Sequence, residues 1–191
     1  MSVVLLHWAD YHRVLWKNGF GSTREVASAL VGRGQEFDWR VSVADLGDQG
    51  PFSVFPGVDR VITVIDGPGV SLIDAEKEHR LSPLAPFAFS GDRAVSCRLP
   101  GGPARAVNVM TRRGRATASA KVVDVQGRHD ASVDPEETLL MLPLSGQLTL
   151  EHGESGVVPL ARLDAVRLGG PGDIRITGQG TGMEIRITTS H

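Results

Sequence analysis

Residues 65–72 read Ile-Asp-Gly-Pro-Gly-Val-Ser-Leu, and residues 144–150 read Leu-Ser-Gly-Gln-Leu-Thr-Leu. In both stretches apolar residues stand on either side of a glycine-containing turn, which is typical of two antiparallel strands joined by a tight connection. Residues 81–92 and 158–169 follow them and are also alike, because each combines leucine and proline with a glycine near its end. The sequence therefore repeats one β unit, and a repeat of this kind predicts two similar halves.

Apolar and polar residues alternate along much of the chain with the period of two that is typical of β-strands. The 23 glycines and 11 prolines divide these runs into short strands. One segment is ambiguous, since residues 22–25 fit a helix capping box before the apolar residues 26–30. Gly32 and Gly34 would end such a helix after about two turns, so we expect a strand over residues 23–30. The alternating runs are residues 37–43, 107–110, 174–177 and 185–188.

Each repeat resembles one half of a cupin β-barrel in the order of its elements. This order is strand, glycine turn, strand, polar linker, a stretch with leucine and proline, glycine and strand. Two copies predict an all-β fold of the bicupin type, in which two cupin-like antiparallel barrels or sandwiches are fused. We expect residues 1–114 to form the N-terminal half, with a ligand pocket, and residues 115–191 to form the C-terminal half. The two halves are expected to pack as one compact unit.

The composition is that of an ordinary globular protein and argues against several classes of function. The 191 residues carry a net charge of −2 and are 41% hydrophobic, so no basic excess indicates nucleic-acid binding. The first residues lack a basic leader, and no apolar stretch approaches the about 20 residues that span a bilayer. We therefore expect a cytoplasmic protein without a membrane or nucleic-acid partner, and a homodimer is compatible with the sequence.

The sequence offers no residue for covalent catalysis. Cys97 is the only cysteine, so an intrachain disulfide is impossible. It alternates with Val95 and Leu99 on one strand face, which predicts a buried structural thiol. No Gly-x-Ser-x-Gly elbow occurs, and the glycines that follow Lys17 do not form a P-loop because the lysine precedes them.

Histidine spacing argues against the metal site that many cupins contain. Such a site uses a His-x-His pair, a nearby carboxylate and a later histidine, and no His-x-His pair occurs here. His79 and His152 lie in polar linkers, where we expect exposure to solvent. The sequence predicts no metal and no other cofactor. The six histidines are His7, His12, His79, His129, His152 and His191.

Residues 16–25 combine side chains that a purely structural loop does not need. Trp16 offers a flat apolar face, Lys17 and Arg24 are cations, and Asn18 and Thr23 offer neutral hydrogen-bonding groups. The glycines between them let the backbone turn where other residues could not follow. This mixture favours a segment that binds a small polar ligand.

Three further polar residues are candidates for a pocket. Arg60 precedes an apolar strand, where it could present a planar fork to a carboxylate or form a structural clamp with Asp59. Asn108 alternates with Val107 and Val109, so it would line the barrel interior if the valines face outward. Arg40 lies on the polar face of its strand, where it could be a pocket cation or face solvent, and we favour solvent.

The order and spacing of seven segments over about residues 8–125 resemble the HutD/Ves family. The resemblance implies a bicupin without bound metal and a pocket in the N-terminal barrel. It also implies binding of a small carboxylate, such as urocanate or formylglutamate, and in some members a link to histidine utilisation. The segments are residues 16–19, 23–25, 37–42, 50–53, 55–60, 89–92 and 108–112.

This chain departs from the family pattern at two places. Phe20 stands where the family usually has a third glycine, and an aromatic ring there would narrow the pocket mouth. Residues 102–106 lack the Asp-Phe that usually precedes the asparagine in the family. The family's site assignment therefore matches this chain less closely around Asn108. The resemblance places the ligand-binding residues at Trp16, Lys17, Asn18, Thr23, Arg24, Arg60 and Asn108.

The leading hypothesis is a metal-free bicupin that binds a small anionic metabolite and regulates histidine utilisation. Trp16 would stack on the ligand, Arg24 and Arg60 would bind its carboxylate, and Lys17 would attract it. An alternative hypothesis is a metal-free isomerase or hydrolase in which Lys17, enclosed in a pocket, acts as a base. A third is a scaffold that binds a partner through an exposed apolar sheet face.

Overall fold

The computed structural model describes residues 2–31, 36–75, 77–151 and 156–190. Their structure is built from antiparallel β-strands, which confirms the all-β prediction, and β3 confirms the strand expected over residues 23–30. In this described part of the chain no helix is long and apolar enough to cross a membrane. The elements are β1 (Ser2–Leu6), η1 (Trp8–Asp10), β2 (Arg13–Leu15), β3 (Gly21–Leu30), β4 (Phe37–Leu46), β5 (Gly50–Pro51), β6 (Val58–Asp66), β7 (Val70–Asp74), β8 (Lys77–Leu81), β9 (Phe87–Ser90), β10 (Val95–Arg98), β11 (Ala104–Arg112), β12 (Ala116–Val133), β13 (Glu137–Glu151), β14 (Val157–Leu160), β15 (Ala165–Gly169) and β16 (Gly172–Thr189).

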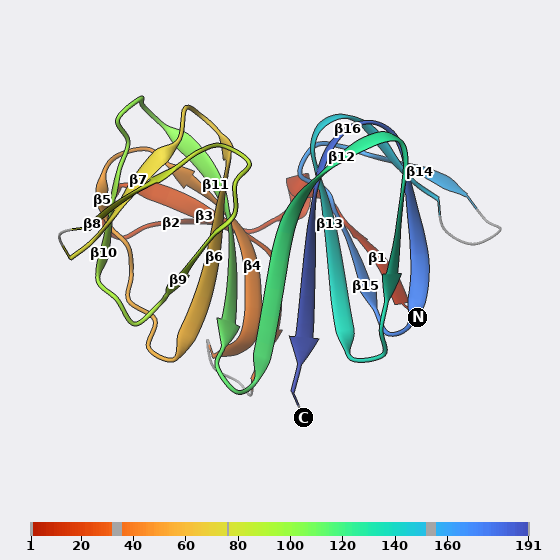
Figure 1. The fold of residues 1–191 in the computed structure, drawn as a ribbon, viewed down its shortest axis with the longest axis horizontal. Helices are drawn as coiled ribbons and strands as arrows, with labels where there is room; N and C mark the ends of the chain where they lie inside the picture. The colour runs from red at the N-terminus through yellow and green to blue at the C-terminus, as the bar shows by residue number, and fades with distance from the viewer. Residues whose placement is uncertain (1, 32–35, 76, 152–155, 191) are drawn as a thin grey trace. The chain divides into compact units, whose positions relative to one another are not determined.

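The chain divides into two compact units. The N-terminal unit comprises residues 12–117, and the C-terminal unit comprises residues 2–11 with residues 118–190. The first strand therefore differs from the expected organisation: β1 pairs antiparallel with β15, far along the chain (Figure 1). Val3 and Leu5 of β1 pack against the apolar core of the C-terminal unit. A short apolar run at the start of a chain carries no signal for such a distant partner.

The N-terminal unit contains two sheets that share one apolar core. The larger sheet has the strand order β2-β3-β4-β11-β6-β9, and the smaller has the order β5-β10-β7-β8. Leu46 and Ile62 of the larger sheet belong to the same buried cluster as Leu72 and Cys97 of the smaller one. Cys97 is a buried free thiol, as predicted from its alternation with Val95.

The C-terminal unit repeats the strand pairing of the N-terminal unit. In the N-terminal unit β6 pairs with β9 and β11, and β7 pairs with β8 and β10. In the C-terminal unit the first part of β13 pairs with β15 and the end of β16, and its second part pairs with β14 and the start of β16. A β-bulge between Pro143 and Ser145 joins the two parts of β13. The bicupin prediction, drawn from the repeated glycine turns, is confirmed.

The register makes individual positions of the two halves comparable. Asn108 of β11 pairs with Ile62, three residues before the start of the first repeat at Ile65. Glu184 of β16 pairs with Met141, three residues before the start of the second repeat at Leu144. Asn108 and Glu184 are therefore equivalent positions of the repeat.

Candidate ligand-binding site

Two rows of side chains run across three neighbouring strands of the N-terminal unit. Arg40 of β4 and Arg60 of β6 both pair with Met110 of β11, which lies between them. In the next row, Ser42 and Ile62 both pair with Asn108. Because residues directly opposite in adjacent strands share one face of the sheet, both arginines, Met110, Ser42 and Asn108 project to the same side.

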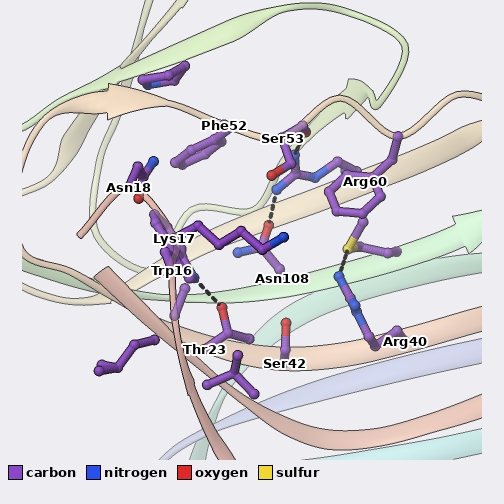
Figure 2. A pocket seen from close by; sticks show the side chains of 16 residues that line it. Trp16, Lys17, Asn18, Thr23, Arg40, Ser42, Phe52, Ser53, Arg60 and Asn108 are labelled. Carbon is purple, nitrogen blue, oxygen red and sulfur yellow. Dashed lines mark hydrogen bonds between the residues drawn. The ribbon is translucent and has the colours of Figure 1, made fainter. Parts of the chain in front are cut away.

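This face forms part of a cavity of about 520 Å³ (Figure 2). Residues 14–18, which include the end of β2 and the turn after it, form one wall, and residues 51–53 with Phe55 form another. The volume lies in the range of about 300–1,000 Å³ that is typical of small-molecule sites. The lining residues are Val14, Leu15, Trp16, Lys17, Asn18, Thr23, Arg40, Ser42, Ala44, Pro51, Phe52, Ser53, Phe55, Arg60, Asn108 and Met110.

Arg60 is the most deeply buried cation of the cavity, with 7% of its surface exposed. Its Nη2 donates a hydrogen bond to Oδ1 of Asn108 at 2.9 Å, and its Nη1 donates to the carbonyl oxygen of Ser53 at 3.5 Å. Its guanidinium carbon also lies 4.7 Å from the ring centroid of Phe89. Burial, and secondarily the charge of Arg40, lowers the pKa of Arg60 to about 10, so the side chain is still a cation at neutral pH.

Arg40 lies in the cavity, so the prediction that it faces solvent is wrong. Its Nη2 donates to Sδ of Met110 at 3.2 Å, and its guanidinium carbon lies 4.9 Å from the ring centroid of Phe37. Burial lowers the pKa of Arg40, although the charge of Glu25 opposes the shift. The face of β4 that carries Arg40 also carries Ala44, which belongs to the apolar core, so this face points inward. The opposite, valine-bearing face of β4 is buried as well. When both faces of a strand are buried, the alternation of polar and apolar residues does not show which of them faces solvent.

Both arginines have donors that the protein leaves unsatisfied. Among the described residues, Nε of Arg40 and Nε of Arg60 are buried atoms without a hydrogen-bond partner, and the other such atom, Oγ1 of Thr63, lies on the opposite face of β6. Neither arginine forms an ion pair with a carboxylate of the part of the chain that the structure describes. An uncompensated buried cation is unfavourable, so this cavity is suited to an anion.

The turn after β2 closes one side of the cavity. Nε1 of Trp16 donates to Oγ1 of Thr23 at 2.7 Å, and the Trp16 ring meets the ring of Phe52 edge to face at 6.2 Å (Figure 2). The turn passes through Gly19, whose φ of 75° favours glycine. Lys17 and Asn18 are exposed at the cavity mouth, and Oδ1 of Asn18 accepts a hydrogen bond from the backbone of the turn.

Arg24 does not line the cavity, in contrast to its predicted role. It follows Thr23 on β3, and successive residues of a strand point to opposite faces. Nη1 of Arg24 instead forms an ion pair with Asp45 at 2.9 Å, and Asp45 also accepts from Nε of Arg105 at 2.6 Å. Burial raises the pKa of the Asp45 carboxyl. The hydrogen bond from Arg105 and the other polar contacts of Asp45 together lower this pKa by more, so the net shift is downward.

Phe20 also differs from its expected position, because it is not among the residues that line the cavity. Its ring lies against the backbone of Gly50, where an added Cβ would come within 2.3 Å of a ring carbon. Its carbonyl oxygen accepts hydrogen bonds from the amides of Gly47 and Asp48 at 3.0 and 3.2 Å. Phe20 therefore fixes the loop after β4 rather than narrowing the mouth.

The donor set of the cavity does not fit a metal ion. Two guanidinium groups would repel a cation, and none of the described residues that line the cavity is a carboxylate, histidine or cysteine. In the described residues no group of three or more His, Cys, Asp or Glu side chains is placed to hold a metal. His79 is partly buried, with its ring centroid 5.0 Å from that of Phe87, whereas His152 and His191 lie outside the described residues.

The equivalent position of the C-terminal unit already contains an anion. Glu184 is 1% exposed, and its carboxylate lies 2.7 Å from Nε of Arg186, 2.8 Å from Nε2 of His129 and 3.1 Å from Nζ of Lys121. Burial raises the pKa of Glu184, but hydrogen bonds from Arg186, His129 and Lys121 give a net shift below its ordinary value. The second half thus surrounds a carboxylate with cations where the first half has Asn108.

Comparison with known proteins identifies the family of this bicupin. The HutD family model matches residues 8–185. The chain belongs to the HutD family. This confirms the HutD/Ves resemblance of the sequence segments.

Relatives of this HutD chain include proteins that match it over different shares of their length. A Pseudomonas putida protein, named as an uncharacterized 21.2 kDa protein in the hutC 3' region, is 37% identical over 168 residues, which cover 87% of this chain and 86% of the relative. Protein Ves from Citrobacter koseri is 41% identical over 112 residues, or 58% of each chain. HutD from Pseudomonas fluorescens SBW25 (formate condition) has a TM-score of 0.86 and 35% identity over all of both chains.

Proposed function

We propose that this HutD protein binds a small carboxylate metabolite in the cavity of its N-terminal unit, and that Arg60 is the principal contact. The observation that carries the proposal is that Arg60 is a buried cation on the cavity wall without an anionic partner among the described residues. A ligand carboxylate would supply the missing charge. It would also accept hydrogen bonds from a planar guanidinium, which is suited to paired carboxylate oxygens.

The remaining lining residues support a ligand with an apolar body and polar ends. Trp16 and Phe52 provide apolar ring surface, and their mutual edge-to-face contact holds both rings in place. Asn108 accepts from Arg60, which leaves its amide nitrogen as a further donor. Lys17 at the exposed mouth would attract an anion from solution.

The C-terminal unit gives internal support for the choice of a carboxylate. Glu184 is the counterpart of Asn108, and the side chains of Lys121, His129 and Arg186 lie within 3.1 Å of its carboxylate. The same arrangement of strands can therefore hold a carboxylate at this position of the repeat when cationic side chains lie beside it.

The proposed role is regulatory, within histidine utilisation. The Pseudomonas putida relative is named for its place beside hutC, and this chain shares the HutD family model over residues 8–185. Urocanate and formylglutamate are the small carboxylates that this role suggests as ligands. No metal takes part in the proposed binding.

Isothermal titration calorimetry with urocanate and formylglutamate tests the proposal. We expect saturable binding of at least one of them to the wild-type protein. Arg60→Met should weaken it by about 10- to 100-fold, because a charge-assisted hydrogen bond is lost. Arg80→Met is the matched control, since the Arg80 side chain is 85% exposed and lies outside the cavity. Absence of binding by folded wild-type protein, or an equal loss in both variants, would refute the proposal.

The structure gives less support to the enzyme alternative. That hypothesis required an enclosed Lys17 acting as a base, whereas Lys17 is exposed at the cavity mouth. The environment that would desolvate the amine is therefore missing.

A further inference from the structure

A second cavity of the N-terminal unit, with a volume of about 240 Å³, lies between β9 of the larger sheet and strands β7, β8 and β10 of the smaller sheet. This β8–β9 cavity has no described lining residue in common with the cavity that contains Arg60. It is therefore a separate site. An apolar cavity of about 150 Å³ is large enough to bind benzene, so the β8–β9 cavity has room for one ring with a substituent.

Aromatic rings form much of the wall of the β8–β9 cavity. Phe87 and Phe89 of β9 are partly buried, and their rings stack with centroids 6.3 Å apart. The ring centroid of His79 lies 5.0 Å from that of Phe87. The buried side chains of Leu72 and Val95 complete the apolar part of the lining. Because aromatic rings pack favourably against one another, this surface favours a ligand with a planar ring.

His79 brings a polar group to the core-facing side of the smaller sheet. Leu72 pairs with His79 on one side and with Cys97 on the other, so the three side chains share one face. Leu72 and Cys97 are 1% and 2% exposed and belong to the apolar core. The imidazole lines the cavity, and no described residue forms a hydrogen bond with it. A neutral imidazole offers one donor and one acceptor, and both are available to a ligand.

The other polar side chains of the lining already have partners. Arg93 forms an ion pair with Asp74, and the hydroxyl of Ser90 donates a hydrogen bond to the carboxylate of Asp92 at 2.8 Å. The described lining therefore presents no unpaired charge to a ligand. A charged ligand would lose its hydration without gaining a counter-ion, so the cavity is suited to a neutral molecule.

We infer that the β8–β9 cavity binds a small neutral aromatic molecule that carries one hydrogen-bonding group, such as a hydroxyl. The ring packs on Phe87 and Phe89, and the polar group forms a hydrogen bond with His79. This site goes beyond the proposed function and does not depend on it, because carboxylate binding is assigned to Arg60 in the other cavity.

Phenol and toluene are suitable probes, since they have nearly the same shape and only phenol has a hydroxyl. Each is titrated into ¹⁵N-labelled protein, and the amide shifts give both the place of binding and the dissociation constant. We expect both probes to shift amides of residues 72, 79 and 87–90. His79→Phe keeps a ring but removes the hydrogen bond, so phenol should bind about three- to tenfold more weakly, and the affinity for toluene should stay within about twofold. His12→Phe, at an exposed position outside this cavity, is the matched control and should change neither affinity.

Thermal melting first establishes that each variant is folded, and His79→Leu replaces His79→Phe if the latter is not. Absence of saturable shifts around the β8–β9 cavity would overturn the inference, and so would shifts confined to residues 14–18 and 51–53 of the other cavity. An equal loss of phenol and toluene binding in the His79 variant would also overturn it, because the imidazole would then form no hydrogen bond with the ligand. Each of these outcomes leaves carboxylate binding by Arg60, which is measured separately, unaffected.

Discussion

Oδ1 of Asn108 lies 2.9 Å from Nη2 of Arg60, so a neutral amide faces a buried cation at the centre of the cavity. The equivalent residue of the C-terminal unit is Glu184, which is charged and surrounded by cations. The first half therefore holds its guanidinium in position without neutralising it. This difference between the halves can be tested directly.

Asn108→Asp should convert the cavity into a self-neutralised site. The new carboxylate would pair with Arg60, which should raise the free energy of unfolding of the ligand-free protein by about 1–3 kcal/mol. It should also weaken carboxylate binding by about tenfold or more. Urea denaturation and calorimetry measure the two effects. A variant that is less stable than wild type yet binds as well would show that Arg60 does not need an anion.

Glu184→Gln should destabilise the C-terminal unit at pH 7. The substitution leaves Arg186 and Lys121 without their shared anion, at a cost of about 1–3 kcal/mol. Glu136→Gln, at an exposed position, is the control and should change stability by less than about 0.5 kcal/mol.

The same carboxyl should make stability depend on acidity. Its pKa in the folded protein lies below the ordinary value of 4.5, so the folded state binds its proton less readily than the unfolded state does. Its contribution is complete above pH 4.5 and is lost as the pH falls through the folded pKa. The stability difference between wild type and Glu184→Gln should therefore shrink as the pH falls from about 5 to 3. A constant difference over that range would contradict the assigned contacts.

Cys97 should be chemically inert in the folded protein. Burial raises the pKa of its thiol to about 11, so the reactive thiolate is scarce at pH 8. We expect reaction with a thiol reagent such as Ellman's reagent to be slow in buffer and fast in denaturant, with one equivalent released in the latter. Fast reaction in buffer, at a rate unchanged by denaturant, would show that the thiol is accessible.

The fold could be predicted from sequence because its signals are local. Glycine turns near Gly67 and Gly146 and the alternating runs mark strands and their connections, and two copies of one pattern mark two halves. The partner of β1 could not be predicted in this way. Its pairing with β15 joins residues more than 150 positions apart, and an apolar strand of five residues is compatible with many partners.

The site was partly predictable for a similar reason. Trp16, Thr23, Arg60 and Asn108 stood out by residue type in an apolar context, and all four line the cavity. The assignment of Arg24 failed because one step along a strand reverses the face. The solvent-facing alternative for Arg40 is wrong because its place in the cavity depends on register with Met110, which the sequence does not show. Phe52 and Phe55 could have been considered from their place before Arg60.

Because Glu184 belongs to the chain, the two halves differ in whether they need an anion from solution. A chain built from two similar halves would be expected to take up two ligands. Here one half is complete as synthesised, because its anion is covalently part of the chain, and under the proposed function the other half would take its anion from solution. The two similar halves would then differ in occupancy, and a single equivalent of carboxylate ligand per chain should saturate the protein.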